Sequence, residues 1–174
     1  MRCFIGIDLP IVAINEIQKT QKKLKSNFTG RLTSSENLHL TLKFLGKIEN
    51  GVINDVRKKL SSIKHSPFEL TLKDIGVFSQ KFIKIIWVKV SDVPLQPLVD
   101  NCLSDIFEPE NRFMGHITIA RVKSLADKNF FLQLINKTRV NEISFMIRDF
   151  YLKESILTKD GPIYKDMNRY KLSS

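Results

Sequence analysis

Two short segments of the sequence have residue types and spacing suited to acid–base chemistry. Residues 39–42 read HLTL and residues 116–119 read HITI, so each opens with a histidine followed two positions later by a threonine. In a β-strand, alternate side chains point to opposite faces. Each segment would therefore present histidine and threonine together on one face and bury two aliphatic side chains on the other. The chain has only three histidines, and two of them occupy this pattern.

Two histidines that face one phosphorus atom can divide the work of cleaving a phosphodiester. The unperturbed imidazole pKa of about 6.5 lets a neutral ring take a proton from water and a protonated ring give one to the departing oxygen. His39 and His116 are the candidates for these two roles. Thr41 and Thr118 are candidates for hydrogen bonds to the non-bridging phosphate oxygens. Neither role requires a metal ion or another cofactor.

Arg121 is a further candidate phosphate ligand, because a guanidinium can hold a phosphate through paired hydrogen bonds. It follows Thr118 by three positions, so it shares the histidine face only if the strand bends or ends between them. A structural ion pair is the alternative role for Arg121.

The histidines also have an alternative role, because a strand histidine is more often a packed residue than a catalyst. The repeated pattern favours catalysis, since neither histidine nor threonine is a natural core residue twice over. A zinc site at His39 and His116 has little support, because no third ligand stands beside either one. His65 has no threonine partner and is interpreted as a surface or helix-end residue. Trp87 is interpreted as a core residue.

Composition and charge are those of a globular protein with an affinity for polyanions. The 174 residues fit one domain and are 43% hydrophobic and 26% charged, as in ordinary globular chains. Lys+Arg 28 against Asp+Glu 18 gives 28 − 18 = +10. This surplus favours nucleic acid over a membrane as the partner, because no basic amphipathic anchor is evident. Simple solubility is the alternative explanation of the charge.

The cysteines and the hydrophobic runs predict where the protein resides. Cys3 and Cys102 lie far apart without metal-type spacing, so neither a disulfide framework nor a zinc site is expected. Free thiols suit a reducing compartment. No apolar run has the form of a signal peptide or the length of a membrane span. We therefore expect a cytoplasmic protein with no membrane association, and a monomer as the default state.

The elements that must position the two motifs occur twice in the same order: strand, helix, loop, motif strand, helix, strand. In the first half, the patterns predict strand 2–8, helix 11–24, the strand from His39, helix 52–63 and strand 68–75. In the second half, they predict strand 82–90, a helical stripe over 95–106, strand 116–122, a helix capped by Asp127, and strands 141–147, 150–158 and 163–172.

The spacing of the two halves indicates an internal duplication. The histidines are 116 − 39 = 77 positions apart, and the helix starts that follow them are 127 − 50 = 77 apart. We predict one domain, 1–174, made of two pseudo-symmetric lobes with repeat units of roughly 1–78 and 79–174. A pseudo-twofold arrangement would bring the two histidines to opposite walls of one cleft.

Several segments together resemble the 2H phosphoesterase superfamily, and specifically the RNA 2′,3′-cyclic phosphodiesterase family once called 2′-5′ RNA ligases. The resemblance covers nearly the whole chain. The segments that carry it are residues 4–10 (FIGIDLP), 36–46 (ENLHLTLKFLG), 76–88, 112–123 (RFMGHITIARVK), 154–155 and 161–164 (GPIY). Two positions depart from the family pattern: Gly115 replaces a common proline, and Ile83-Lys84 replaces a common arginine.

The resemblance implies an α+β fold that is bilobal and internally duplicated, with antiparallel sheets facing a central cleft and helices packed outside. It implies hydrolysis of RNA 2′,3′-cyclic phosphate ends to 2′-phosphomonoesters without a metal or cofactor, and an ATP-independent reverse 2′-5′ ligation. His39 would be the acid and His116 the base, with Thr41, Thr118 and Arg121 binding phosphate. The partner would be RNA with such an end, tRNA fragments being one candidate.

Two alternatives remain open at the level of sequence. The first is a nucleotide- or RNA-binding module whose two-histidine cleft senses phosphate without turnover. The second is a phosphodiesterase that acts on a small cyclic nucleotide. The residues alone do not distinguish which histidine is the acid and which is the base.

Overall fold

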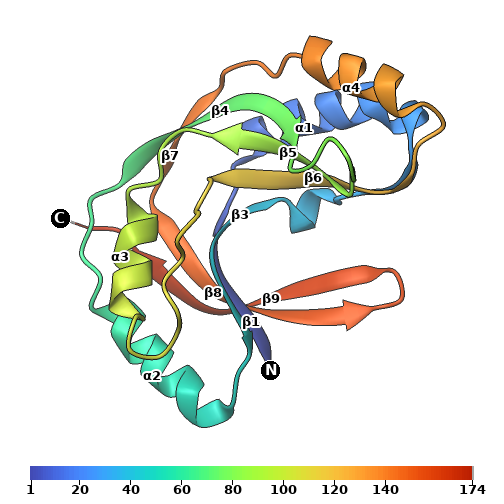
Figure 1. The fold of residues 1–174 in the computed structure, drawn as a ribbon. Coiled ribbons are helices and arrows are strands. Elements are labelled where there is room, and N and C mark those ends of the chain that lie inside the picture. The colour runs from blue at the N-terminus through green and yellow to red at the C-terminus, as the bar shows by residue number, and fades with distance from the viewer. Residues whose placement is uncertain (174) are drawn as a thin grey trace.

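One curled antiparallel sheet contains all the strands of the computed structural model, which describes residues 1–173 (Figure 1). The strands pair in the order β7-β4-β5-β6-β3-β1-β8-β9, and β2 pairs with β6 outside that path. Their bounds are β1 Arg2–Asp8, β2 Thr29–Leu32, β3 His39–Lys47, β4 Phe68–Val77, β5 Ile85–Val90, β6 His116–Ser124, β7 Ser144–Ile147, β8 Asp149–Thr158 and β9 Gly161–Lys171.

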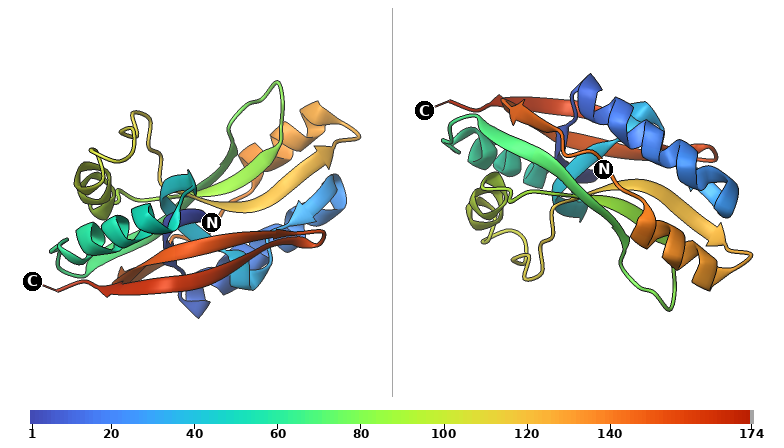
Figure 2. Two further views of the ribbon diagram at one scale, coloured as in Figure 1. Left: turned by 90° about the horizontal axis from the view of Figure 1, so that it is seen from below. Right: turned by 90° about the horizontal axis from the view of Figure 1, so that it is seen from above.

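The helices lie outside the sheet, in two groups. Helices α2 and α3 lie together at one end of the molecule, and α1 and α4 lie together at the other (Figures 1 and 2). The long β8–β9 hairpin extends toward the second group (Figure 2). The bounds are α1 Ile11–Leu24, α2 Asn50–Ser61, α3 Leu95–Cys102 and α4 Lys128–Lys137, with short 3-10 turns at Lys25–Asn27 and Ser35–Asn37. The predicted α+β class, with antiparallel strands and outer helices, is confirmed.

The two motif strands, β3 and β6, meet at the centre of the sheet. They share one register pair, Leu40 with Ile117, and each of these residues directly follows a motif histidine. Both side chains are completely buried. The aliphatic positions of the motifs therefore join the two halves of the sheet through the core, while the histidines and threonines occupy the other face.

The strands of the two predicted repeat units are interleaved in space. β1 and β3 of the first unit pair with each other, and β8 of the second unit pairs with β1. β4 of the first unit lies between β5 and β7 of the second. Each half of the curled sheet thus contains strands from both halves of the chain.

The helices are interleaved in the same way. Helix α1 contacts β6, and helix α3 contacts β3. Each unit's first helix therefore packs behind the other unit's motif strand.

Three predicted elements are longer than the observed ones. The strand predicted over 82–90 begins at Ile85, because the Phe82 amide instead donates to Ser79 Oγ at 3.1 Å in a turn. The helix predicted over 95–106 ends at Cys102, and the chain continues in turns to Phe107. The strand predicted over 141–147 is confined to 144–147.

Two local predictions concern turn and cap chemistry. The helix cap at Asp127 is confirmed, since its carboxylate accepts from the Phe130 amide at 2.9 Å. The predicted turn between β8 and β9 is present: Lys159 and Asp160 form it, and Gly161 begins β9. The short strand β2 is not among the predicted elements. Its four residues carry little periodicity, and it exists through pairing with β6.

Among residues 1–173, no helix has both the length and the apolar character needed to cross a bilayer.

Candidate functional site

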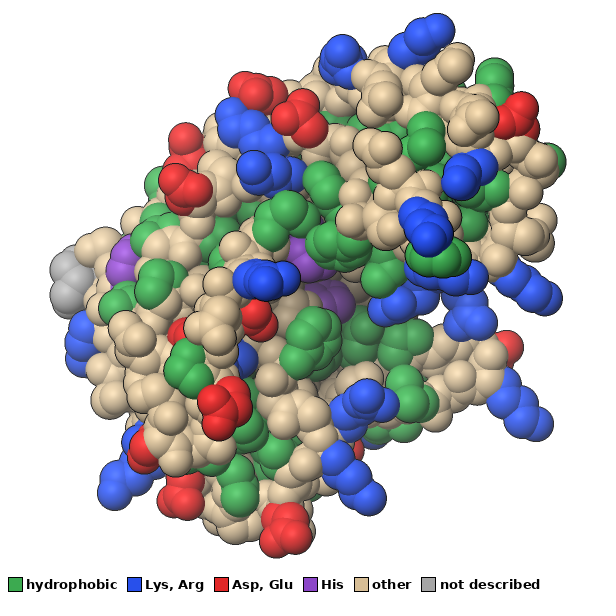
Figure 3. Space-filling model, viewed as in Figure 1, with side chains coloured by type: hydrophobic (Ala, Val, Ile, Leu, Met, Phe, Trp, Pro, Cys, Tyr) green, Lys and Arg blue, Asp and Glu red, His purple; other side chains and the backbone are tan. Residues whose placement is uncertain are grey.

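A cleft of about 340 Å³ lies on the face of the sheet that carries both motifs. Figure 3 shows histidine side chains at the bottom of a hollow and basic side chains around its opening. The cleft walls come from β2, the turn before β3, the two motif strands and the β8–β9 hairpin. Its lining residues are Arg31, Leu32, Thr33, Ser34, Asn37, His39, Thr41, Phe44, His116, Thr118, Arg121, Asp160, Gly161, Pro162 and Tyr164.

All five predicted site residues line this one cleft. The two histidines begin β3 and β6, and the two threonines follow them on the same face. The burial pattern along the first seven residues is the same in both strands, with the motif histidine and threonine half-buried and the aliphatic residues fully buried. The repeated sequence therefore produces repeated local geometry.

The same backbone contact orients both imidazole rings. His39 Nδ1 donates to the Asn37 carbonyl oxygen at 2.7 Å, and His116 Nδ1 donates to the Met114 carbonyl oxygen at 2.8 Å. A carbonyl oxygen only accepts hydrogen bonds, so in both rings Nδ1 carries the proton. The second nitrogen, Nε2, is then left for chemistry in the cleft. In His39 it lies 3.0 Å from Thr41 Oγ1.

The surroundings of His39 favour its neutral form. Burial lowers the pKa of His39, and the hydrogen bond to the Asn37 carbonyl opposes that effect. Among nearby charges, Lys153 and His116 lower this pKa further, whereas Asp8 raises it. A neutral imidazole at Nε2 is able to accept a proton, and a bound anion would raise the pKa again.

Aromatic side chains hold the two rings in place. Phe4 and Tyr164 each lie with their ring centroids 4.9 Å from that of His39. Phe78 meets His116 edge-on at the same distance. Rings packed in this way restrict the rotation of each imidazole, so that Nε2 keeps its direction.

A β-bulge in each motif strand decides what else faces the cleft. In β6, Trp87 pairs with Thr118 and Ile86 with Ala120, which leaves Ile119 without a partner. The extra residue reverses the alternation, so Arg121 lies on the cleft face together with Thr118. The strand therefore bends where the prediction for Arg121 required it. β3 has the same irregularity at Leu42.

The bulge in β3 places Phe44 on the cleft face, 121 − 44 = 77 positions before Arg121. Its side chain is 74% exposed, in contrast to the buried residues on either side. The same position of the repeat thus supplies an apolar ring in one copy and a cation in the other.

Sequence reasoning missed the part of the cleft made by distant segments. Arg31 is the register partner of Arg121 across β2 and β6. Asn37 Nδ2 donates to the Pro162 carbonyl oxygen at 2.8 Å, which ties the turn before β3 to the β8–β9 hairpin. The same hairpin brings Tyr164 against His39. The Asp160-Gly161 signal indicated a turn, but no local pattern indicated where the hairpin would pack.

The other residues considered from sequence lie elsewhere. His65 is half-buried, donates from Nδ1 to the Ser66 carbonyl at 2.6 Å, and does not line the cleft. Trp87 is half-buried, and its ring lies where a side chain on Gly76 would stand, 2.3 Å from an added Cβ. Within residues 1–173, no three His, Cys, Asp or Glu side chains are grouped as a metal site would require.

Gly115, which departs from the family pattern, sits in a confined space before His116. A Cβ added there would lie 2.8 Å from Val90 Cγ2 and 2.9 Å from Val93 Cγ2. Its carbonyl accepts from the Val90 amide at 3.0 Å. The glycine therefore lets the chain approach β5 closely just before the catalytic candidate.

Comparisons with known proteins show which family the chain belongs to. The family model described as LigT like Phosphoesterase matches residues 7–87. An RNA 2′,3′-cyclic phosphodiesterase of Methanothermobacter thermautotrophicus is 32% identical over 99% of this chain and 99% of its own length. One from Thermotoga maritima is 34% identical over 95% of this chain and 92% of its own. The chain belongs to the LigT-like phosphoesterase family.

The fold of this phosphoesterase also matches a solved structure. The crystal structure of TT0787 from Thermus thermophilus superposes with a TM-score of 0.83 at 22% identity, covering 99% of this chain and 98% of the other. The overall arrangement of curled sheet and outer helices is therefore shared with that structure.

Proposed function

We propose that this phosphoesterase hydrolyses the 2′,3′-cyclic phosphate at the 3′ end of RNA and leaves a 2′-phosphomonoester. The observation that carries the proposal is the convergence of two His-x-Thr pairs on one cleft, with Nδ1 of each histidine bonded to a backbone carbonyl two residues back. The net charge of +10 and the names of the relatives support RNA as the substrate class.

In this reaction a water molecule attacks the phosphorus atom and the bond from phosphorus to the 3′ oxygen breaks. One imidazole takes the proton of the attacking water at Nε2, and the other gives a proton to the departing 3′ oxygen. The hydroxyls of Thr41 and Thr118 donate to the non-bridging oxygens as negative charge grows on them. Arg121, on the same face, adds a charge-assisted contact.

The proposal keeps the assignment that the family resemblance implies, with His39 as the acid and His116 as the base. Burial lowers the pKa of His39 in the free protein. The negative charge of the bound phosphate favours the protonated ring, so the acid is charged when substrate arrives. Giving its proton to the 3′ oxygen leaves His39 neutral, and the ring takes up a proton again when the next substrate binds.

Metal-independent turnover and ATP-independent 2′-5′ joining of RNA ends are parts of the same proposal. Two imidazoles supply the acid and the base, so no metal ion is needed for the proton transfers. In joining, the 5′-hydroxyl of a second RNA end attacks phosphorus in place of water, and the same 3′ oxygen departs with a proton. Hydrolysis dominates in dilute solution, because bringing two RNA ends together carries an association cost that attack by water avoids. We further propose that the protein acts as a monomer, with tRNA fragments among its substrates. The free Cys3 and Cys102 fit the reducing cytoplasm as its compartment.

The test is incubation of the protein with an RNA oligomer ending in a 2′,3′-cyclic phosphate, with EDTA present. The expected product is the 2′-phosphate, identified by chromatography against 2′- and 3′-phosphate standards. His39→Ala and His116→Ala should each lower kcat by about a hundredfold or more. His65→Ala is the matched control, because it removes the third histidine outside the cleft and should leave turnover unchanged.

Two outcomes contradict the proposal. Full activity in both His39→Ala and His116→Ala would exclude two-histidine catalysis. Tight binding of the RNA end without any product from the wild-type protein would favour the non-catalytic binding module.

A further inference from the structure

Two loops lead into the two histidines, and they occupy corresponding positions in the two copies of the repeat. The first histidine loop is residues 33–38, before His39. The second histidine loop is residues 108–115, before His116. Thr33 and Glu110, which are 110 − 33 = 77 positions apart, occupy corresponding positions. How these loops are held decides where the imidazoles stand.

The first histidine loop is held by the motif strand of the other histidine. The Thr33 amide donates to the Ile119 carbonyl of β6 at 2.9 Å. Gln21, buried on α1, reinforces this link, because its side-chain nitrogen donates to the Thr33 carbonyl at 2.7 Å and to the Ile119 carbonyl at 2.8 Å. The His39 side of the cleft is thereby fastened to β6.

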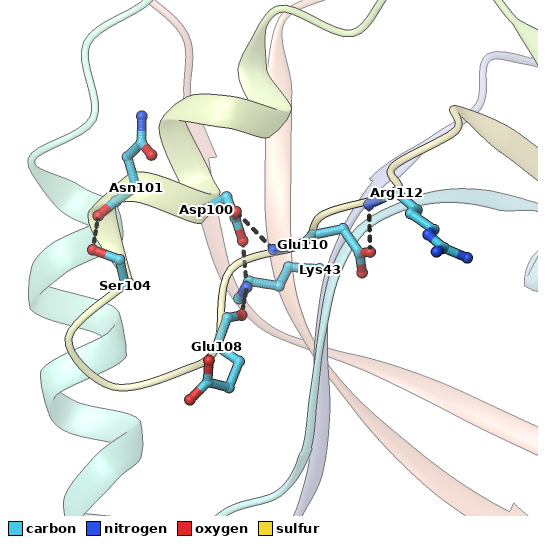
Figure 4. Close-up of polar contacts among 7 residues, drawn as sticks. All are labelled: Lys43, Asp100, Asn101, Ser104, Glu108, Glu110 and Arg112. Carbon is cyan, nitrogen blue, oxygen red and sulfur yellow. Dashed lines mark hydrogen bonds and ion pairs between the residues drawn. The ribbon is translucent and has the colours of Figure 1, made fainter.

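The second histidine loop is held through a buried ion pair (Figure 4). Lys43 of β3 pairs with Asp100 of α3, and the same ammonium donates to the Glu108 carbonyl at 2.8 Å. The other carboxylate oxygen of Asp100 accepts from the Glu110 amide at 2.9 Å. The side chains of Lys43 and Asp100 are only 5% and 11% exposed.

The ion pair has no equivalent in the other copy of the motif. The position 77 residues after Lys43 is Ala120, which is also buried. At this position of the motif strand a small apolar side chain can be buried at no electrostatic cost. A buried lysine loses its hydration and needs polar contacts that compensate for the loss. The compensation is the set of contacts to α3 and to the second histidine loop.

We propose that Lys43 and Asp100 are positioning residues for His116, so that each motif strand holds in place the histidine of the other. Lys43 lies on the same strand as His39, four residues away, yet its polar contacts run to the loop that delivers His116. Only the expected loss of turnover rests on the proposed function. The expected change at the His116 imidazole concerns the free protein and does not depend on it.

The test compares the imidazole signals of the three histidines by long-range ¹H–¹⁵N NMR, together with kcat and KM. The key variant is Lys43→Met combined with Asp100→Leu, which removes both charges and so avoids an unpaired buried group. In this double variant we expect His116 to gain the Nε2-protonated tautomer as its bond to Met114 loosens, while His39 keeps its signals. We expect kcat to fall about tenfold or more, with KM changed less than about threefold.

Two further variants sharpen the result. Gln21→Met should shift the signals of His39 rather than His116. Lys59→Met is the matched control, because it breaks an ion pair to Asp105 just beyond α3 without touching either loop, and it should change neither histidine. Unchanged His116 signals in the folded double variant, or equal shifts at both histidines, would overturn the proposal. Because the NMR arm needs no substrate, it decides the positioning role even if the proposed reaction fails.

Discussion

The β3 and β6 sides of the cleft have the same local geometry and different surroundings. In both, Nδ1 of the histidine donates to a carbonyl two residues back, at 2.7 and 2.8 Å, and a bulge follows the threonine. Around them, His39 packs against two aromatic rings that also contact each other, and Arg121 stands where the other copy has Phe44. The repeated motif thus supplies two imidazoles in the same local geometry, and the unequal surroundings allow them to take unequal roles.

The largest expected effect separates the two roles directly. The substrate is a 2′,3′-cyclic phosphate whose bridging 3′ oxygen is replaced by sulfur, because a thiolate leaves without being protonated. His39→Ala, defective by about a hundredfold on the oxygen substrate, should come within about tenfold of wild type on the sulfur substrate. His116→Ala should remain defective on both, as measured by single-turnover rates.

The opposite pattern, in which only His116→Ala is rescued, would reverse the assignment of acid and base. It would also mean that the burial around His39 serves to keep a base neutral.

A smaller effect tests Arg121, the cation at the repeat position where the other copy has Phe44. Arg121→Gln should raise KM for the RNA oligomer by about three- to tenfold. The dependence of log KM on log salt should become shallower by about 0.7, the contribution of one phosphate contact on a single strand. Arg148→Gln removes an exposed arginine away from the cleft and should leave both quantities unchanged.

The same experiment on a mononucleotide 2′,3′-cyclic phosphate separates two substrate classes. A substrate preference for RNA predicts a steeper salt dependence for the oligomer than for the mononucleotide. Equal kcat/KM and equal salt dependence for both would favour the small cyclic nucleotide as the substrate.

The smallest effect concerns stability and tests the lowered pKa of His39. The folded state prefers the neutral ring, whereas the unfolded chain binds a proton near the unperturbed pKa of about 6.5. The stabilisation is therefore complete above that pH and is lost as the pH falls from there toward the lowered folded pKa. Thermal unfolding should show a smaller loss of Tm on acidification in His39→Gln than in wild type.

Between about pH 8 and 9 the difference in Tm between the two proteins should stay constant, because the ring is neutral in both states. If Tm falls equally with acidification in wild type and in His39→Gln, the pKa of His39 is not lowered in the folded protein.

Sequence patterns alone were sufficient for most features that depend on neighbours in the chain, although not for the turn at Ser79–Phe82 or the end of α3 at Cys102. The apolar run over residues 2–8 predicts a buried strand, and the alternation over 39–42 and 116–119 predicts strands with one buried face. Asp127 predicts a helix start. These signals require only local geometry. The 77-residue offset predicts two equivalent histidines. The pairing of each histidine with its threonine follows from strand periodicity.

Only the tertiary structure decided the features that depend on which strands meet. The bulges at Leu42 and Ile119 arise from register between paired strands, and they bring Phe44 and Arg121 into the cleft. Tyr164 reaches His39 because a hairpin from the end of the chain packs beside β1. The Lys43–Asp100 pair joins residues 57 positions apart. Such contacts are set by packing across the sheet, which local propensity does not encode.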